Sequence, residues 1–383
     1  MPDLGIVGGG QLGRMLLYAA WRWGLDCRVL GRSSTDPCAE ICPGFRTLDW
    51  NDTEKLIHWG RDISCFILEI EHVDVAVLEA WERANKRVFP SSQTLRLIQD
   101  KHKQKEFLSG KGCSVADFEY LSSVEMLAPR HASGFLKSCR EGYDGRGVFQ
   151  LGSAFPFRED LPSFPCLWEK GVEIKQEISV LASQDMEGHV RFYPPVEMVF
   201  DPDSHMMDYA ICPAPLSEEE KERAFSLAAQ VLEAFDSAGL FAIEMFHTVE
   251  GEWYVNEVAP RVHNSGHHTI EGHPTSQFEQ MIRLAMGYPL GETHHLFFSA
   301  TLNWVGAAGS SGSSGPFEYS GLQEVLSTPQ AYPHIYGKKE LRPFRKMGHV
   351  TVLAKEPSEL HEKLSFLRPR IRDGVRLIGS SLG

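Results

Sequence analysis

The chain has 383 residues, of which 42% are hydrophobic and 23% charged, a composition that is typical of a globular protein and excludes a collagen-like repeat or a disulfide scaffold. It carries 38 basic and 51 acidic residues, for a net charge of −13, which argues against binding to nucleic acid or to an anionic membrane, because both require a basic surface. An anionic ligand must therefore meet a local basic cluster.

Eight cysteines are scattered along the sequence without a C-x-x-C pair, so we expect reduced thiols rather than disulfides or a zinc site of paired cysteines. The residues after Met1 lack the basic and apolar segments of a secretory signal peptide. No run of about 18 apolar residues predicts a membrane span. We therefore expect a cytoplasmic protein.

The first part of the chain alternates strands with helices. Apolar runs at 4–7, 27–30 and 65–68 predict strands, and helical spacing of apolar residues predicts helices between them and over 90–108. This alternation favours a parallel sheet covered on both faces.

A glycine turn follows the first strand. Gly8, Gly10 and Gly13 fit a dinucleotide-binding fingerprint, because glycines let a backbone turn approach a phosphate at a helix N-terminus. The second strand ends in Leu30-Gly31-Arg32, without the acidic residue that would hold the ribose of NAD. The turn therefore favours another phosphorylated ligand over NAD, and a purely structural turn is the remaining alternative. No Walker-type ATP motif occurs.

The sequence pattern changes over residues 112–171, where short strands and a glycine loop at 142–147 predict a small α+β unit. Lys137 ends a strand-like stretch before this loop, where its ammonium group can reach nucleotide phosphates beneath the loop's N–H groups. Asp144 and Arg146 lie inside the loop, which favours a functional loop over a plain surface linker.

The third part begins with a helix and a hairpin. Ser217 and Glu220 form a capping box that opens the helix, and Gly239 is expected to end it. Two strands, over 241–246 and 253–258, then flank a turn at Glu250-Gly251.

The hairpin predicts a pair of glutamates. If the turn is symmetric, Glu244 lies directly opposite Glu257 on one face, and like charges so placed destabilise a sheet. A divalent cation would offset the repulsion, and Mg²⁺ prefers carboxylate and phosphate oxygens. Asn256 offers a third oxygen. Two solvated glutamates are the alternative, which the apolar neighbours of this pair disfavour.

Three further segments have an unusual composition: two are candidate anion-binding sites and one is rich in Gly and Ser. The segment 261–268 is rich in Arg, Asn and His, and we favour an anion pocket there over zinc, because His-x3-His-His is not a usual ligand spacing. The basic cluster 338–346 suits a monoester phosphate, since the chain as a whole is acidic. The Gly/Ser segment 309–315 predicts a flexible surface loop.

Together these motifs resemble the ATP-grasp superfamily and, within it, the N5-carboxyaminoimidazole ribonucleotide synthetases of purine biosynthesis. The segments that carry the resemblance are 8–16, 69–71, 99–101, 142–147, 256–267 and 342–349. The resemblance implies an α/β and α+β fold of ATP-grasp architecture. Its parts would be an N-terminal Rossmann-like domain over 1–98, a small mobile lid over 99–171 and a C-terminal mixed-sheet domain over 172–383 with the metal and substrate sites.

The implied enzyme is an ATP-dependent carbon–nitrogen ligase. ATP, bicarbonate and 5-aminoimidazole ribonucleotide would give N5-carboxyaminoimidazole ribonucleotide, ADP and phosphate through carboxyphosphate. The implied cofactors are ATP and Mg²⁺, and the implied assembly is a homodimer. The alternatives are another ATP-grasp ligase, such as a formate-dependent phosphoribosylglycinamide transformylase, and a nucleotide-binding regulator without catalysis.

The resemblance also implies roles for individual residues. ATP would be bound by Lys101, Lys137, Gly142, Tyr143, Asp144, Gly145, Arg146, Gly147, Val148, Glu169, Lys170, Gly171, Val172, Glu177, Asn256 and Glu257. Mg²⁺ would be bound by Glu244 and Glu257. The ribonucleotide and bicarbonate would be bound by Gln11, Glu71, Tyr143, Arg146, Asn264, Lys339, Arg345 and Lys346. The catalytic group would consist of Asp144, which accepts or steers the amine proton, with Arg261, His263 and Lys339 holding bicarbonate and carboxyphosphate.

Overall fold

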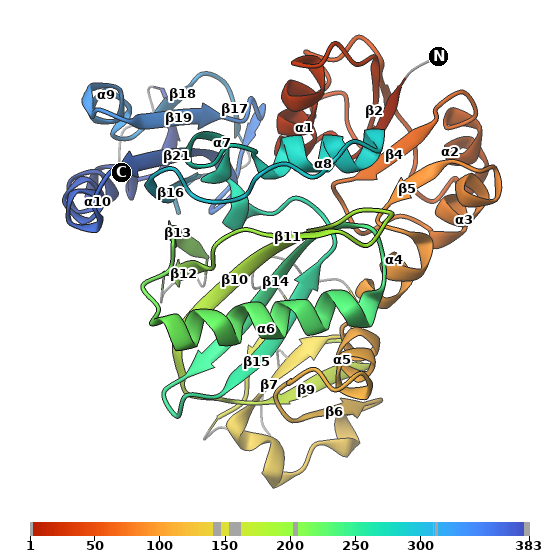
Figure 1. Ribbon diagram of the computed structural model, residues 1–383, viewed down its shortest axis with the longest axis vertical. Helices are drawn as coiled ribbons and strands as arrows, with labels where there is room; N and C mark the ends of the chain where they lie inside the picture. The colour runs from red at the N-terminus through yellow and green to blue at the C-terminus, as the bar shows by residue number, and fades with distance from the viewer. Residues whose placement is uncertain are drawn as a thin grey trace.

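The computed structural model describes residues 3–140, 147–152, 162–201, 206–308, 310 and 313–378. Three main sheets make up the fold, and Figure 1 shows the largest running through the middle of the molecule, with the N-terminal sheet at the upper right and a small sheet below. None of the helices in these residues has the length and apolar content that a membrane crossing needs.

The N-terminal sheet is parallel, as predicted. Its strand order is β3-β2-β1-β4-β5, with β1 at the centre, which is the order of a doubly wound fold. Every residue of β1 and β4 is buried, because helices cover both faces. The strands are β1 (Leu4–Val7), β2 (Cys27–Gly31), β3 (Phe45–Thr47), β4 (Cys65–Leu68) and β5 (Arg87–Phe89), and the helices are α1 (Gln11–Trp21), α2 (Thr53–Trp59), α3 (Val75–Arg83) and α4 (Ser92–Ile98).

A small antiparallel sheet follows helix α5 (Lys101–Gly110). Its order is β6-β9-β7-β8, and its core contains Leu121, Leu136 and Trp168. The strands are β6 (Phe118–Leu121), β7 (Gly134–Ser138), β8 (Val148–Gln150) and β9 (Cys166–Lys170).

The large sheet has the order β15-β14-β10-β12-β13-β16-β21-β19, with β11 beside β10. Every pair that the structure describes in it is antiparallel, so it is not the mixed sheet that we expected. The strands are β10 (Ile174–Gln184), β11 (Val190–Phe192), β12 (Val196–Phe200), β13 (Met207–Cys212), β14 (Gly239–Thr248), β15 (Trp253–Ala259), β16 (Phe298–Val305), β19 (Ala331–Ile335) and β21 (Lys346–Ala354).

Helices pack on both faces of this sheet, and α8 joins it to the N-terminal part. Helix α6 covers β10 and β14 (Figure 1) and packs Leu227, Val231 and other apolar residues into their core. Helix α8 packs beside α1 and shares a core with it. The helices of this region are α6 (Glu218–Phe235), α7 (Thr269–Gly272), α8 (Gln277–Met286), α9 (Leu322–Ser327) and α10 (Pro357–Ile371).

Two local predictions were wrong. Helix α6 ends at Phe235 rather than at Gly239, because Asp236 adopts the left-handed conformation and Gly239 already belongs to β14. Part of the expected loop 309–315 is a strand: β17 (Ser313–Ser314) pairs with β20 (Glu340–Leu341). A second short pair joins β18 (Phe317–Tyr319) to β22 (Val375–Leu377).

Candidate functional site

The hairpin of β14 and β15 places Glu244 opposite Glu257, as predicted, but the assumed symmetry is wrong. Nearer the turn, Met245 pairs with Val255, so the hairpin is centred on residue 250 rather than between residues 250 and 251. A β-bulge at Asn256 adds one residue to β15 and restores the predicted partner of Glu244. A bulge re-aims the side chains beside it, and here it brings both Asn256 and Glu257 to lysine side chains.

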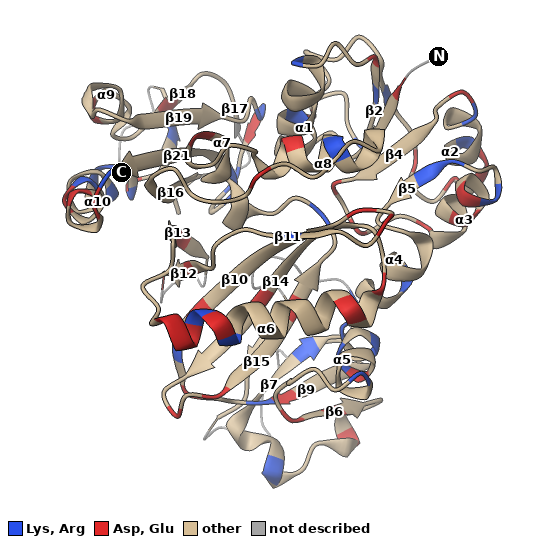
Figure 2. Cartoon of the chain, viewed as in Figure 1, with Lys and Arg blue, Asp and Glu red and all other residues tan. Residues whose placement is uncertain are grey.

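Three lysines surround this bulge. Lys101 Nζ lies 3.0 Å from Glu257 Oε1, and Lys137 Nζ donates to Asn256 Oδ1 at 3.1 Å. Lys105 donates to the backbone oxygens of Val255 and Asn256, each at 3.2 Å. Figure 2 shows the resulting meeting of basic and acidic segments around α5, β9 and β15.

Glu169 connects two of these lysines from strand β9. Its carboxylate lies 2.7 Å from Lys137 Nζ and 3.2 Å from Lys105 Nζ. Burial would raise the pKa of Glu169, but the two ammonium groups outweigh it and hold the pKa below its usual value. Glu169 was predicted to bind ATP, and in this conformation its carboxylate is engaged by the two lysines.

The pKa values of the two paired glutamates are shifted in opposite directions. Burial, reinforced by the charges of Glu257 and Glu177, raises the pKa of Glu244 to about 8. Burial would raise the pKa of Glu257 too, but the charges of Lys101, Lys137 and Arg261 lower it below its usual value. Burial raises the pKa of Glu177, on β10, to about 7. The charges of Lys101 and Lys346 act on Glu244 but do not offset its burial and the two neighbouring carboxylates, and a divalent cation would supply further positive charge there.

His263 and Asn264 follow β15, and His263 reaches the same group. His263 Nε2 lies 3.4 Å from Glu244 Oε1, and its Nδ1 lies 2.9 Å from Ser265 Oγ. Gln277 fixes the backbone here, because its side chain bonds both the N–H and the carbonyl of His263. Asn264 is buried, and its Oδ1 has no hydrogen-bond partner among the described groups.

Arg261 links the hairpin to the N-terminal sheet. Its Nε donates to Glu71 Oε1 at 2.9 Å, so the structure brings together two residues predicted for neighbouring substrates. Glu69 is a site residue that sequence reasoning did not assign. Its Oε1 accepts the Gly10 N–H at 2.8 Å, so an internal carboxylate occupies the glycine turn that begins at Gly8.

The basic cluster 338–346 is partly paired with acids. Lys339 Nζ lies 2.8 Å from Glu40 Oε2. Arg342 pairs with Glu340, and Arg345 donates to the Glu340 carbonyl at 2.8 Å. The charge of Lys346 offsets part of the rise in the pKa of Glu244, so Lys346 acts on one of the two metal-binding candidates.

Some of the predicted ATP-binding residues lie in a part of the chain that the structure does not describe. Gly142, Tyr143, Asp144, Gly145 and Arg146 lie outside the described residues.

Of the remaining predicted residues, Lys170 is exposed and pairs with Asp117, and Gly171 donates its N–H to the Ser133 carbonyl. Gly147 and Val148 lead into β8, Val172 lies just before β10, and Gln11 begins α1.

Sequence reasoning missed Lys105, although a signal was present. Lys101 and Lys105 are four residues apart on one helix, so they share a face. Lys105 is 3% exposed, and such burial of a lysine requires partners.

The zinc alternative in segment 261–268 is not supported by the contacts. His263 lies against Glu244, His267 stacks on His349, and His268 contacts Ser299. The three rings therefore have different surroundings.

Three family models match the chain in order. The ribonucleotide synthetase preATP-grasp domain matches residues 1–99, the ATP-grasp domain matches 106–278, and the phosphoribosylaminoimidazole carboxylase C-terminal domain matches 299–363.

Curated relatives match nearly the whole chain. The N5-carboxyaminoimidazole ribonucleotide synthase of Bacillus subtilis is 31% identical over 93% of this chain and 92% of its own length. The phosphoribosylaminoimidazole carboxylase of Schizosaccharomyces pombe is 35% identical over 95% of this chain, but the match takes in only 67% of that protein.

Solved structures give the same result. The N5-carboxyaminoimidazole ribonucleotide synthetase of Thermotoga maritima superimposes with a TM-score of 0.86 at 33% identity, over 98% of this chain and 100% of the other. The N5-carboxyaminoimidazole synthase of Aspergillus clavatus, in complex with ADP and 5-aminoimidazole ribonucleotide, has a TM-score of 0.84 at 30% identity, over 97% and 98%.

Proposed function

The chain belongs to the N5-carboxyaminoimidazole ribonucleotide synthase family of ATP-grasp enzymes, and we propose that it is the ATP-dependent ligase that carboxylates 5-aminoimidazole ribonucleotide in purine biosynthesis. The observation that carries the proposal is the Glu244–Glu257 pair beside Lys101 and Lys137, in a chain that matches such enzymes from end to end. We further propose bicarbonate as the carbon source, a homodimer and a cytoplasmic location.

The residues of the bulge fit a magnesium ion. Glu244, Glu257 and Asn256 offer only oxygen donors, and Mg²⁺ is a hard ion that takes such donors together with substrate phosphates. When bound, Mg²⁺ neutralises charge on the phosphoryl group that is transferred. Lys101 and Lys137 would contact the phosphates of ATP, and Lys105 would keep Glu169 and the bulge in place.

The reaction proceeds in two steps in this proposal. An oxygen of bicarbonate attacks the γ-phosphorus of ATP, which releases ADP and forms carboxyphosphate. The amine of the ribonucleotide then takes up the carboxyl group and loses a proton, and phosphate leaves. Arg261 and His263 would hold the bicarbonate oxygens, and positioning of this kind is the main source of rate in phosphoryl transfer.

We propose further roles for residues that would contact the ribonucleotide and bicarbonate. Asp144 would take the amine proton, and Gln11, Glu71, Asn264, Lys339, Arg345 and Lys346 would bind the ribonucleotide or bicarbonate. The divisions at 98/99 and 171/172 would delimit a lid that closes over ATP and excludes water from carboxyphosphate.

Phosphate release tests the proposal. We expect release from ATP that requires both 5-aminoimidazole ribonucleotide and bicarbonate. Release that depends on formate and a glycinamide ribonucleotide would show a transformylase instead. ATP binding without release under any of these conditions would favour a nucleotide-binding regulator.

A further inference from the structure

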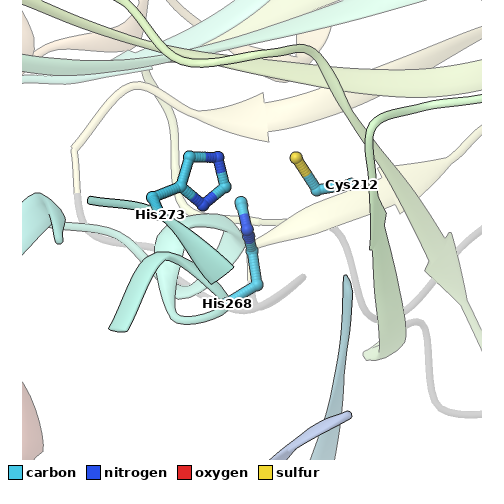
Figure 3. Close-up of side chains that lie close together, drawn as sticks. All are labelled: Cys212, His268 and His273. Carbon is cyan, nitrogen blue, oxygen red and sulfur yellow. The ribbon is translucent and has the colours of Figure 1, made fainter. Parts of the chain in front are cut away.

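Three buried residues outside the proposed active site form a cluster of metal-binding side chains. Cys212 ends strand β13, and His268 and His273 lie immediately before and after the short helix α7. One ligand atom from each lies within 4.8 Å of those from the other two. Figure 3 shows the two rings and the sulfur turned towards a common space.

The histidines have lone pairs without partners. His268 and His273 are only 1% and 5% exposed, yet Nε2 of His268 and both ring nitrogens of His273 make no hydrogen bond to any residue that the structure describes. Buried polar atoms in folded proteins are nearly always paired.

Ser299 selects the tautomer of His268. The Ser299 hydroxyl donates to the Cys212 carbonyl at 3.4 Å, which leaves its oxygen as an acceptor for His268 Nδ1, 3.3 Å away. A proton on Nδ1 leaves the lone pair on Nε2, the nitrogen without a partner. Metal-bound histidines are commonly oriented by a hydrogen bond of this kind to the second nitrogen.

We propose that Cys212, His268 and His273 bind a thiophilic metal ion, Cu⁺. The thiol would lose its proton to solvent when the metal–sulfur bond forms. One thiolate, two neutral imidazoles and Cu⁺ sum to zero charge, whereas Zn²⁺ would leave a net positive charge in a buried site. Trigonal sites of two histidines and one cysteine are typical of copper, while structural zinc takes four ligands.

The geometry requires only a small adjustment. Ligand atoms at about 2.0–2.3 Å from one ion are separated from each other by roughly 3.3–4 Å. The three ligand atoms lie within 4.8 Å of one another, so side-chain movements of about 1 Å would bring them to these separations. The bound ion would tie the end of β13 to both ends of α7 and so stabilise the fold.

Titration of the full-length protein tests the site. Cu⁺ is supplied anaerobically against a chromophoric chelator, and we expect one equivalent to bind and the melting temperature to rise. Cys212→Ala and His273→Ala should each weaken binding by roughly 100-fold. Cys65→Ala is the matched control, because Cys65 is also fully buried but lies in β4, and it should bind as the wild type does.

X-ray absorption of the wild-type complex gives an answer even if a variant fails to fold. One sulfur and two nitrogen neighbours around copper would support the site. Scattering without sulfur, or an equal loss of binding in Cys65→Ala, would overturn it. A parallel titration with Zn²⁺ checks the metal, and Zn²⁺ that binds these three residues more tightly than Cu⁺ would overturn the copper assignment.

Discussion

Lys105 and Glu169 form an ion pair of 3.2 Å in which the two side chains are only 4% and 5% exposed. Glu169 also pairs with Lys137, so one carboxylate is shared between two ammonium groups. The sharing explains why the two partners shift differently. At Glu169, the charges of the two lysines outweigh the effect of burial and lower the pKa. At Lys105, burial outweighs the attraction of the shared Glu169 carboxylate and lowers the pKa to about 8.

Replacing Lys105 by methionine should therefore be costly. The change keeps the apolar stem but leaves Glu169 with one partner, and breaking a buried pair costs about 3–5 kcal/mol. We expect a loss near the lower end of that range, because Lys137 remains, together with weaker ATP binding. Lys103→Met is the control on the same helix, since Lys103 is exposed. Chemical unfolding that gives equal losses for both variants would contradict this role.

The same residue predicts a pH dependence. The pKa of Lys105 is 10.5 in the reference state and about 8 in the fold, so between these values the unfolded chain binds more protons. The unfolding free energy contributed by Lys105 therefore rises with pH in this window. Unfolding at pH 7.5, 8.5 and 9.5 should show the wild type gaining stability relative to Lys105→Met, and a constant difference would refute the shifted pKa.

Much of the fold was predictable because it follows from local patterns. The strands at 4–7, 27–30 and 65–68 are short apolar runs between turns, and the structure confirms all three. The prediction failed where the chain departs from regular geometry. The bulge at Asn256 and the left-handed cap at Asp236 have no distinct sequence pattern, so the hairpin centre and the helix end were misplaced.

The site was predictable only in part, because its contacts join distant segments. The Glu244–Glu257 pairing follows from one hairpin. In contrast, Lys105 meets Glu169 across two elements, and Lys339 meets Glu40 from the N-terminal part of the chain. No local periodicity indicates such pairs. We therefore missed Lys105, and we interpreted the basic cluster 338–346 without knowing that Glu40 pairs with Lys339.

The glutamate pair predicts opposite effects on stability and on metal binding. Glu244→Gln removes like-charge repulsion worth up to about 1 kcal/mol across the strands, so the metal-free variant should melt at a higher temperature than the wild type. It should also weaken Mg²⁺ binding in the presence of ADP by about tenfold or more, because it removes an anionic oxygen. Calorimetric melting and Mg²⁺ titration measure the two effects.

The gain in stability should depend on pH. The pKa of Glu244 is raised from 4.5 to about 8 in the fold, so the wild type loses stability as pH rises between these values. The advantage of the glutamine variant should therefore grow from pH 5 to pH 8. Glu252→Gln, at the exposed turn of the same hairpin, should change neither melting nor Mg²⁺ binding. An equal effect in this control would exclude a specific pair.

The glycine turn predicts a sharp contrast between two glycines. Gly8 has φ +123°, and a Cβ there would lie 2.2 Å from Glu69 Cγ, whereas Gly24, with φ +69°, has nothing within 4 Å of such a Cβ. Gly24→Ala should cost about 1 kcal/mol for its backbone conformation alone. Gly8→Ala should cost about 2–4 kcal/mol, because it adds overpacking against Glu69. Similar unfolding free energies for the two variants would show that Glu69 does not occupy the turn.

The capping box of α6 gives the last test. The Ser217 N–H donates to Glu220 Oε2 at 2.8 Å, the Glu220 N–H donates to Ser217 Oγ at 3.2 Å, and Lys175 pairs with the same carboxylate. Ser217→Ala should cost about 1 kcal/mol.

The hydrogen bond from Lys175, with those at Ser217, lowers the pKa of Glu220 from 4.5 to about 2. Its contribution is therefore complete above pH 4.5 and is lost as pH falls towards 2. Acid unfolding of Glu220→Gln should show a shallower loss of stability than the wild type in that window. Glu222→Gln, at an exposed position of the same helix, should follow the wild type, and a shallower slope there would mean that general acidity of α6, rather than the cap, sets the acid limit.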